Sequence, residues 1–228
     1  AVENPDKAKL QLLIDKGEYF ACVEDDVDEV QSDIGMMDQW SKDASERMKI
    51  KIDQRVLTDL LTDVAAANKG ASAGAISADL NIGVASSPIA ITKSNAIDQI
   101  VNMGTVLDEA NCPESDRFIV IPAKMAGHIK LSDLKDASIT GDGSSPLRNG
   151  RLGMIDRFTV YVSHNLYKNG SEFSIIAGHK MGFTFASQMT NMETIRSETT
   201  FGNIIRGLQV YGYKVVKPEA LCVGVVTV

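Results

Sequence analysis

The sequence predicts an α+β fold organised around one exceptionally long helix. Apolar residues recur every three or four positions along residues 32–68, which indicates one buried helical stripe. Short segments rich in β-branched and aromatic residues dominate the second half of the chain and are typical of strands. The 228 residues, 44% of them hydrophobic and 23% charged, suffice for one sizeable domain or two small ones.

The first segment, residues 9–23, predicts two short strands around a turn at Lys16 and Gly17. A dense acidic patch follows, formed by Glu24, Asp25, Asp26, Asp28 and Glu29. Its spacing does not match a calcium-binding EF-hand loop, which needs a central glycine and a glutamate at the twelfth position. We interpret the negative charge as favouring the positive N-terminal end of the helix that follows.

The long helix is expected over residues 32–68. Its apolar positions are Met37, Trp40, Ala44, Met48, Ile52, Val56, Leu60 and Val64. Ser32 or Asp33 suits the N-cap, and Gly70 marks the C-terminal end. At about 1.5 Å per residue such a helix is about 50 Å long, so we expect it to span the whole molecule.

The middle of the chain predicts a linker followed by a helix, a strand and a short helix. Residues 65–87 are rich in Ala, Gly and Ser and indicate a loosely structured crossing, the best candidate for a domain boundary. A helix is expected over residues 94–111, a strand over 117–121, and a short helix from Pro122 to Leu131. The expected buried positions of the first of these helices are Ile97, Ile100, Val101, Gly104 and Leu107.

The second half of the chain predicts an exposed loop and then five strands. Residues 139–150 are dense in turn-forming and polar residues. The strands are expected at residues 157–163, 173–177, 192–197, 208–217 and 221–228. Residues 208–216 place Leu208, Val210 and Gly212 on one face and Gln209, Tyr211 and Tyr213 on the other, as in a half-exposed strand.

Composition excludes several classes of function. A net charge of −7 gives no global attraction to nucleic acid. Cys22, Cys112 and Cys222 are isolated, which predicts core residues in a reducing compartment and neither zinc nor disulfides. No apolar run approaches the ~18 residues that span a bilayer, and the sequence shows no signal peptide. The first residues are typical of the interior of a protein, which indicates a preceding N-terminal segment removed by trimming, processing or disorder.

No pattern indicates a catalytic, cofactor-binding or metal site. The Gly141-Asp142-Gly143 loop lacks the Gly-Lys-Ser/Thr ending of a phosphate-binding loop. The three histidines, His128, His164 and His179, lack metal-ligand spacing, and no nucleophile motif supports acyl transfer. We therefore expect no enzyme activity, and a small-molecule-binding enzyme stays only a minor alternative.

Charge complementarity between copies is the remaining candidate for a site. The second half carries a modest basic set, Arg148, Arg151, Arg157, Arg196 and Arg206, without the interleaved aromatic residues of a nucleic-acid surface. In an oligomer such arginines can meet the acidic patch of a neighbour. The candidate inter-subunit contacts are Glu24, Asp25, Asp26, Asp28, Arg148 and Arg151.

Four passages resemble the major capsid proteins of tailed bacteriophages, which share the Hong Kong 97-type fold. They are YFACVEDDVD at residues 19–28, SDRFIVIPA at 115–123, LRNGRLGMIDRFTVYVSHNL at 147–166 and FGNIIRGLQVYGYKVVKPEAL at 201–221. The last two are fairly specific together, because they combine position, turn glycines and strand alternation. The resemblance covers nearly the whole chain.

The resemblance implies a division into two domains. Residues 19–70 and 190–217 would form a peripheral domain containing the spine helix at 32–68, and residues 71–189 and 218–228 an axial domain of layered structure. Residues 1–18 would be a remnant of the family's extended loop, with the N-terminal arm and most of that loop absent. The 140–150 loop would lie on the axial side. No position matches the family's Lys–Asn cross-linking motif.

The resemblance also implies the function. The expected function is that of a structural subunit that self-assembles into hexamers and pentamers of an icosahedral phage head around double-stranded DNA. Its expected location is the virion capsid, assembled in the bacterial host cytoplasm. Its partners would be other copies of itself, with scaffold, portal and maturation protease, and the packaged DNA would lie nearby without specific contact. No membrane and no cofactor is implied. The main alternative is the shell protein of an encapsulin nanocompartment.

Overall fold

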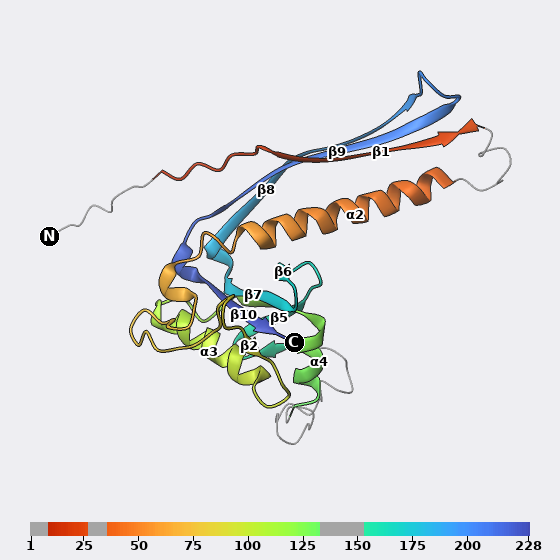
Figure 1. Ribbon diagram of the computed structural model, residues 1–228. Coiled ribbons are helices and arrows are strands. Elements are labelled where there is room, and N and C mark those ends of the chain that lie inside the picture. The colour runs from red at the N-terminus through yellow and green to blue at the C-terminus, as the bar shows by residue number, and fades with distance from the viewer. Residues whose placement is uncertain (1–8, 27–35, 133–152) are drawn as a thin grey trace. The chain divides into compact units, whose positions relative to one another are not determined.

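A computed structural model describes residues 9–26, 36–132 and 153–228 (Figure 1). The chain divides into two compact units. The first is drawn from Ala1–Ile52 and Thr184–Val216, and the second from Asp53–Phe183 and Lys217–Val228. Each unit contains a sheet of its own, and the expected mixture of helices and sheets is confirmed. None of the described helices is both long and apolar enough to span a membrane.

The sheet of the first unit has three strands. Their spatial order is β1 (Lys16–Asp25), β9 (Gly202–Val215) and β8 (Phe183–Arg196). β1 and β9 run antiparallel, with Lys16 opposite Tyr211 at one end and Asp25 opposite Gly202 at the other. Figure 1 shows β8 and β9 as long neighbouring arrows, with the first strand beside β9. The strands expected at 192–197 and 208–217 are therefore parts of longer elements.

The turn expected at Lys16 and Gly17 is wrong, because both residues belong to β1. Gly17 lies opposite Val210, and the ammonium of Lys16 lies 4.7 Å from the centre of the Tyr213 ring. Pairing with β9 and packing on its side chains override the local turn preference of a Lys-Gly pair. Residues 9–15 form no strand, although Lys214 Nζ donates a 3.0 Å hydrogen bond to the Gln11 carbonyl.

The long helix α2 is shorter than expected and spans Met36–Asp59. Residues 32–35 lie outside the described residues, but the expected end near residue 68 is wrong. After Asp59 the backbone N–H of Thr62 and its hydroxyl both turn back to the Asp59 carbonyl, at 3.3 and 2.9 Å. Leu60 and Val64 continue the apolar spacing because they are buried in the following turn. The apolar spacing therefore reflects which residues are buried, and it extends beyond the helix. The hydrogen bonds of Thr62 to Asp59 end the helix itself.

The apolar stripe of α2 is only partly buried. Ile52 is buried, and Ala44, Met48 and Val56 are half-buried. Trp40 keeps 40% of its surface exposed. The stripe is therefore a contact face at the spacing expected from the sequence, but its N-terminal part stays accessible to solvent.

The alternation expected along β9 is only partly present, because Tyr211 and Gly212 are both buried although they are neighbours in the strand. Tyr211 is fully buried and stacks between Phe185 and Tyr213, at ring-centroid distances of 5.9 and 6.2 Å. Leu208, on the apolar face of the sequence pattern, is 39% exposed. A tyrosine ring is large enough to provide much of the buried surface itself, which is why the tyrosine face is the covered one.

The second unit contains a sheet of seven strands. Its order is β2 (Ile89–Ala90), β10 (Leu221–Thr227), β7 (Glu172–His179), β3 (Arg117–Ile121), β5 (Phe158–Val162) and β4 (Met154–Ile155), and β6 (Lys168–Asn169) pairs with β7. The pairs β3–β5 and β10–β2 are parallel, and the other pairs are antiparallel. The strands expected near 117, 157, 173 and 221 are confirmed.

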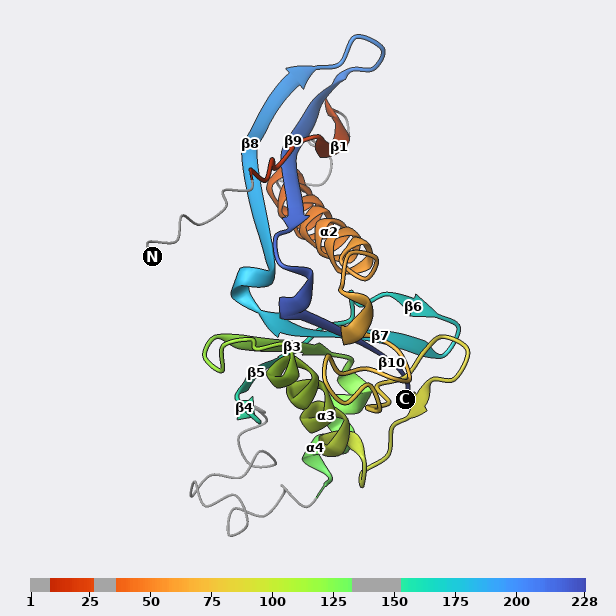
Figure 2. The same ribbon diagram turned by 90° about the vertical axis from the view of Figure 1, so that its left-hand side faces the viewer.

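Two helices, α3 (Ala96–Glu109) and α4 (Ala123–Lys130), cover one face of this sheet (Figure 2). Both were expected from the sequence. Ile100, Met103 and Leu107 of α3 share one core with Ile119 and Ile121 of β3, and all five side chains have 0% exposure. Val101 was expected in this core, but it is 42% exposed because the buried face of α3 is centred on Ile100, Met103 and Leu107.

The irregular segment after α2 is not the loose linker that its composition predicted. It begins with the short 3₁₀ helix η1 (Ala66–Asn68), and Ala73 and Ile82 are completely buried. The buried Asn68 side chain donates hydrogen bonds of 2.6 and 2.9 Å to the carbonyls of Glu219, in η4 (Pro218–Ala220), and Leu221. Small residues allow this segment to approach the sheet closely instead of making it flexible.

Gly83 shows why a small residue is needed there, and it gives a stability test. Its φ is +90°, and a Cβ at this position would collide with the Val225 carbonyl oxygen of β10. We expect Gly83→Ala to lower the free energy of unfolding by about 2 kcal/mol or more. Gly127→Ala is the control, because a Cβ in α4 meets nothing within 4 Å. It is expected to raise stability by about 0.5–1 kcal/mol. Denaturant unfolding of both variants measures this, and an unchanged Gly83→Ala would contradict the packing described.

Candidate functional site

One face of the sheet in the first unit is open to solvent. Along β1 the residues with odd numbers, from Gly17 to Asp25, are all exposed, whereas those with even numbers are buried or half-buried. Tyr19 is 79% exposed, and its partner on β9, Leu208, is 39% exposed. We call this surface the open face, and its apolar members are Tyr19, Val23, Ile204, Leu208 and Val210. Exposed apolar surface of this kind is typical of a protein–protein contact.

The opposite face of this sheet forms a groove with α2. The groove has a volume of about 380 Å³, and its lining includes Phe20, Cys22, Trp40 and Met48. Lys51 Nζ lies 2.6 Å from a carboxylate oxygen of Glu18, which is 7% exposed. This ion pair joins α2 to β1. The helix therefore packs on one face of the sheet, whereas the side chains of the open face are exposed.

The structure separates the members of the predicted acidic patch. Glu24 is 6% exposed, and its Oε1 has no hydrogen-bond partner among the described residues. Asp26 forms an ion pair with Arg196, and one of its hydrogen bonds measures 2.9 Å. Asp25 points to the open face. Asp28 and Glu29 lie outside the described residues, as do Arg148, Arg151 and the 139–150 loop.

The remaining arginines of the predicted basic set all have acidic partners within the chain. Arg196 contacts Asp26, and Arg206 contacts Glu193 on the open face. Arg157 contacts Asp108 at 2.8 Å and Glu114 at 3.0 Å. In the described part of the chain, these three arginines therefore stabilise the subunit itself, which weakens their attraction for an acidic neighbour.

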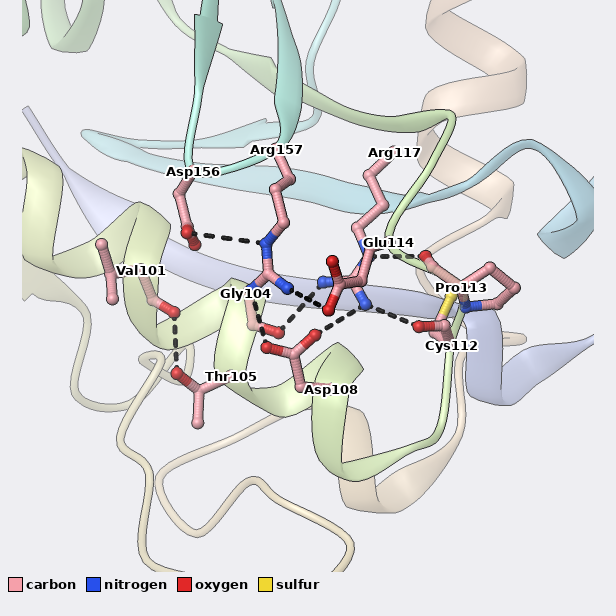
Figure 3. A network of polar contacts seen from close by, with 10 residues as sticks. All are labelled: Val101, Gly104, Thr105, Asp108, Cys112, Pro113, Glu114, Arg117, Asp156 and Arg157. Carbon is pink, nitrogen blue, oxygen red and sulfur yellow. Dashed lines mark hydrogen bonds and ion pairs between the residues drawn. The ribbon is translucent and has the colours of Figure 1, made fainter.

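A buried arginine that the sequence did not single out connects α3 to the sheet. Arg117 is 1% exposed, and it donates hydrogen bonds to the carbonyls of Pro113 at 2.8 Å and Cys112 at 2.6 Å (Figure 3). Its guanidinium also lies 2.7 Å from Asp108. The opposite oxygen of Asp108 accepts from Arg157, so one carboxylate bridges Arg117 of β3 and Arg157 of the turn between β4 and β5. The sequence contained a signal for this residue. Arg117 lies two residues before Ile119 and four before Ile121, so its side chain is on the same buried face of the strand.

Asp108 is the charged centre of this network. Partial burial alone would raise the pKa of Asp108, but hydrogen bonds from Arg157 and Arg117, together with their positive charges, hold it below its ordinary value. Asp156 and Arg157 form the two-residue turn between β4 and β5, with φ values of +45° and +65°. The network therefore holds a strained hairpin turn against the end of α3.

Among the described residues weighed for chemistry, His179, Cys112 and Cys222 are buried. His179 is buried, and its Nδ1 accepts a 3.0 Å hydrogen bond from the backbone of Met181. Burial raises the pKa of the thiols of Cys112 and Cys222. No group of three or more His, Cys, Asp or Glu side chains in the described ranges is arranged to hold a metal ion. The candidate functional features are thus surfaces.

The Arg117 network predicts unequal costs for its two arginines. Arg117→Met leaves Asp108 and the carbonyls of Pro113, Cys112 and Gly104 without their buried partner. We expect a loss of about 3–5 kcal/mol in the free energy of unfolding. Arg157→Met removes a side chain that is 36% exposed, and we expect a loss of about 1 kcal/mol or less. If denaturant titrations gave the two variants equal losses in the free energy of unfolding, the larger role assigned to Arg117 would be wrong.

The network also predicts a dependence of stability on pH. Because the folded-state pKa of Asp108 lies below its ordinary value of 3.8, the stabilisation is complete above that pH. It is lost as the pH falls through the lower folded-state pKa. We expect Asp108→Asn to be less stable than the native chain at pH 7, and the difference to shrink as the pH falls below about 4. A constant difference between pH 7 and pH 2 would contradict the assignment.

Comparisons with known proteins agree on one family. The model of a family described as phage capsid protein matches residues 12–224. A solved chain from Mycobacterium phage Che8 has a TM-score of 0.74 and 26% identity, over 93% of this chain and 71% of that one. The capsid of cyanophage P-SCSP1u has a TM-score of 0.65 and 16% identity, over 98% and 78%. An encapsulin complex from Synechococcus elongatus has a TM-score of 0.60 and 10% identity, over 93% and 73%. A search of curated proteins gives no significant match.

The last two likenesses show the fold alone, whereas the family match extends over nearly the entire chain. An exposed apolar sheet face fits a protein that makes contacts with other subunits. The chain belongs to the phage capsid protein family, and it is a structural, shell-forming component of a virion capsid.

Proposed function

We propose that this chain is a major capsid protein of the Hong Kong 97 type, which assembles into hexamers and pentamers of an icosahedral head around double-stranded DNA. The observation that carries the proposal is the open face of the first unit. Its apolar side chains, Tyr19 and Leu208 foremost, have no covering layer among the described residues. In a shell, the edge or surface of a neighbouring subunit covers such a face.

The two units correspond to the domains of that fold in this proposal. In this proposal the first unit, with its long sheet and the first part of α2, is the main part of the peripheral domain expected over 19–70 and 190–217, although residues 53–70 belong to the second unit. The second unit, with its layered sheet and helices, is the main part of the axial domain expected over 71–189 and 218–228. The contiguous helix α2 and the long strands β8 and β9 support this assignment, because they are the extended elements that a peripheral domain needs.

Contacts between charges make a smaller contribution in this proposal. Of the acidic candidates, Asp25 is the described member with an exposed side chain and suits a basic neighbour. Glu24, Asp26 and Asp28 stay members of the same candidate set, with Arg148 and Arg151 as the proposed partners across the interface. The net charge of −7 suits a container that holds DNA without binding it tightly. Scaffold, portal and maturation protease complete the proposed partners, with assembly in the host cytoplasm.

An encapsulin-type shell is the second candidate, because an encapsulin complex shares the fold. The two candidates differ in what the shell encloses. A phage head contains double-stranded DNA, and an encapsulin contains a protein cargo. The contents of particles isolated from the native source therefore decide between them.

The assembly proposal predicts particles. The full-length protein, purified with and without a scaffold, is expected to form rings or closed shells visible by electron microscopy. Leu208→Lys places a charge on the open face and is expected to reduce the assembled fraction about tenfold, with an unchanged melting temperature. A native protein that stays monomeric at high concentration in both conditions would overturn the proposal. Full assembly of Leu208→Lys would remove the open face as its basis.

A further inference from the structure

The second unit contains a loop at residues 73–80 whose conformation is fixed by hydrogen bonds. Ala73 and Leu80 close its base by exchanging two backbone hydrogen bonds, of 2.8 and 3.0 Å. Ala73 is completely buried, so the base is anchored in the core. The loop is thereby fixed at both ends, and its tip points away from the core with residues 75–79 all exposed.

A carboxylate holds the tip of this loop in one conformation. Glu109, at the end of α3, accepts hydrogen bonds from the backbone N–H groups of Ile76 at 2.9 Å and Ser77 at 3.0 Å. These bonds hold the pKa of Glu109 below its ordinary value. Ala78 has a φ of +52°, and a Cβ on Gly74 would lie 2.6 Å from the Glu109 carboxylate. Strain retained by dedicated hydrogen bonds is typical of a functional loop.

What the loop presents is a single large apolar side chain. Ile76 is 80% exposed, and its neighbours in the loop are small residues apart from Asp79. One exposed isoleucine on a mobile surface needs no explanation. Here it stands on a strained loop that Glu109 fixes in advance, which lowers the entropy cost of binding through that side chain.

The same unit contains an apolar groove of about 300 Å³. Its lining includes Leu57 from α2, Phe118 and Val120 from β3, Tyr161 from β5, and Phe183. Phe118 and Phe183 meet edge to face, with their centroids 6.0 Å apart. Lys180 lies in the lining with its side chain 69% exposed, and its ammonium forms an ion pair with Asp116 at 2.7 Å. The volume is at the lower end for ligand pockets, which suits one or two inserted side chains.

A copy cannot fill its own groove with its own loop. Glu109 ties the loop to α3, which covers the face of the sheet that carries Ile119 and Ile121. The groove lies on the other face, because Phe118 and Val120 alternate with those residues along β3. An apolar projection and an apolar groove on opposite faces of one unit make a head-to-tail contact, which closes into rings when the rotation between copies is suitable.

We propose that Ile76 of one copy inserts into the Leu57–Phe118–Tyr161–Phe183 groove of a second copy, with Asp79 beside Lys180. The inference rests on the proposed self-assembly and names the residues of one contact in it. Charge makes a secondary contribution to the direction of the contact. Asp79 lies in the exposed tip, and the 69% exposed ammonium of Lys180 has donors left for a second carboxylate beside Asp116.

Photo-cross-linking of the full-length chain tests the contact. Ile76 is replaced by p-benzoylphenylalanine, and isotope-labelled and unlabelled copies are mixed before assembly, so that links between copies are recognised by mass. We expect links between copies to peptides that contain Tyr161 or Phe183. The matched control places the same reactive group at Val101, which is 42% exposed on α3. It is expected not to link to that groove.

Two substitutions give an independent measure. Ile76→Ser is expected to reduce the assembled fraction about tenfold, and Glu109→Gln to give a smaller reduction, because it frees the loop but keeps Ile76. Val101→Ser is expected to assemble like the native chain. Particles that form normally with Ile76→Ser, or links from position 76 only to other regions or within one copy, overturn the inference and leave the proposed function standing. A native chain that forms no particles overturns both.

Discussion

The ten-residue ladder between β1 and β9 determines which side chains the first unit presents. It joins residues 16–25 to residues 202–211, from opposite ends of the sequence. Because side chains alternate along a strand, a slip of one residue would exchange the two faces. Glu18 and Glu24 would then lie in solvent, and Tyr19 and Val23 would lie under α2. The register thus decides both the Glu18–Lys51 ion pair and the open face.

Charge and apolar surface have separate roles in this subunit. Arg117, Arg157, Arg196 and Arg206 all have acidic partners within the chain. The exposed apolar residues, such as Tyr19 and Ile76, are instead presented by backbone that pairing or hydrogen bonding fixes. A shell that must form from identical copies gains from this separation, because internal ion pairs keep the subunit rigid while apolar patches determine contacts.

Local elements were predictable from the sequence, and their ends and surroundings were not. The helix α3, the strand β3 and the helix α4 follow directly from periodicity and from Pro122. The end of α2 was misplaced because buried Leu60 and Val64 keep a helical spacing beyond the helix itself. Composition alone suggested flexibility for residues 65–87, since a count of Ala, Gly and Ser does not show how closely the backbone approaches the sheet.

The candidate surfaces were the least predictable part. The burial of Arg117 could have been predicted, because it lies two residues before Ile119 on the same face of the strand. The pairing of Asp26 with Arg196 could not, because Arg196 lies 170 residues later in the sequence. The open face needs the register of β1 on β9, and the Ile76 loop needs the position of Glu109. Each depends on long-range pairing, which a local pattern does not contain.

The ladder also has a consequence for the timing of synthesis. β9 is made about 180 residues after its partner β1. At about 5–20 residues per second, the first strand waits roughly 10–40 s without its partner. The register that creates the open face is absent from every nascent chain during that interval. Incomplete subunits therefore lack the open face, which forms only after β9 has been synthesised.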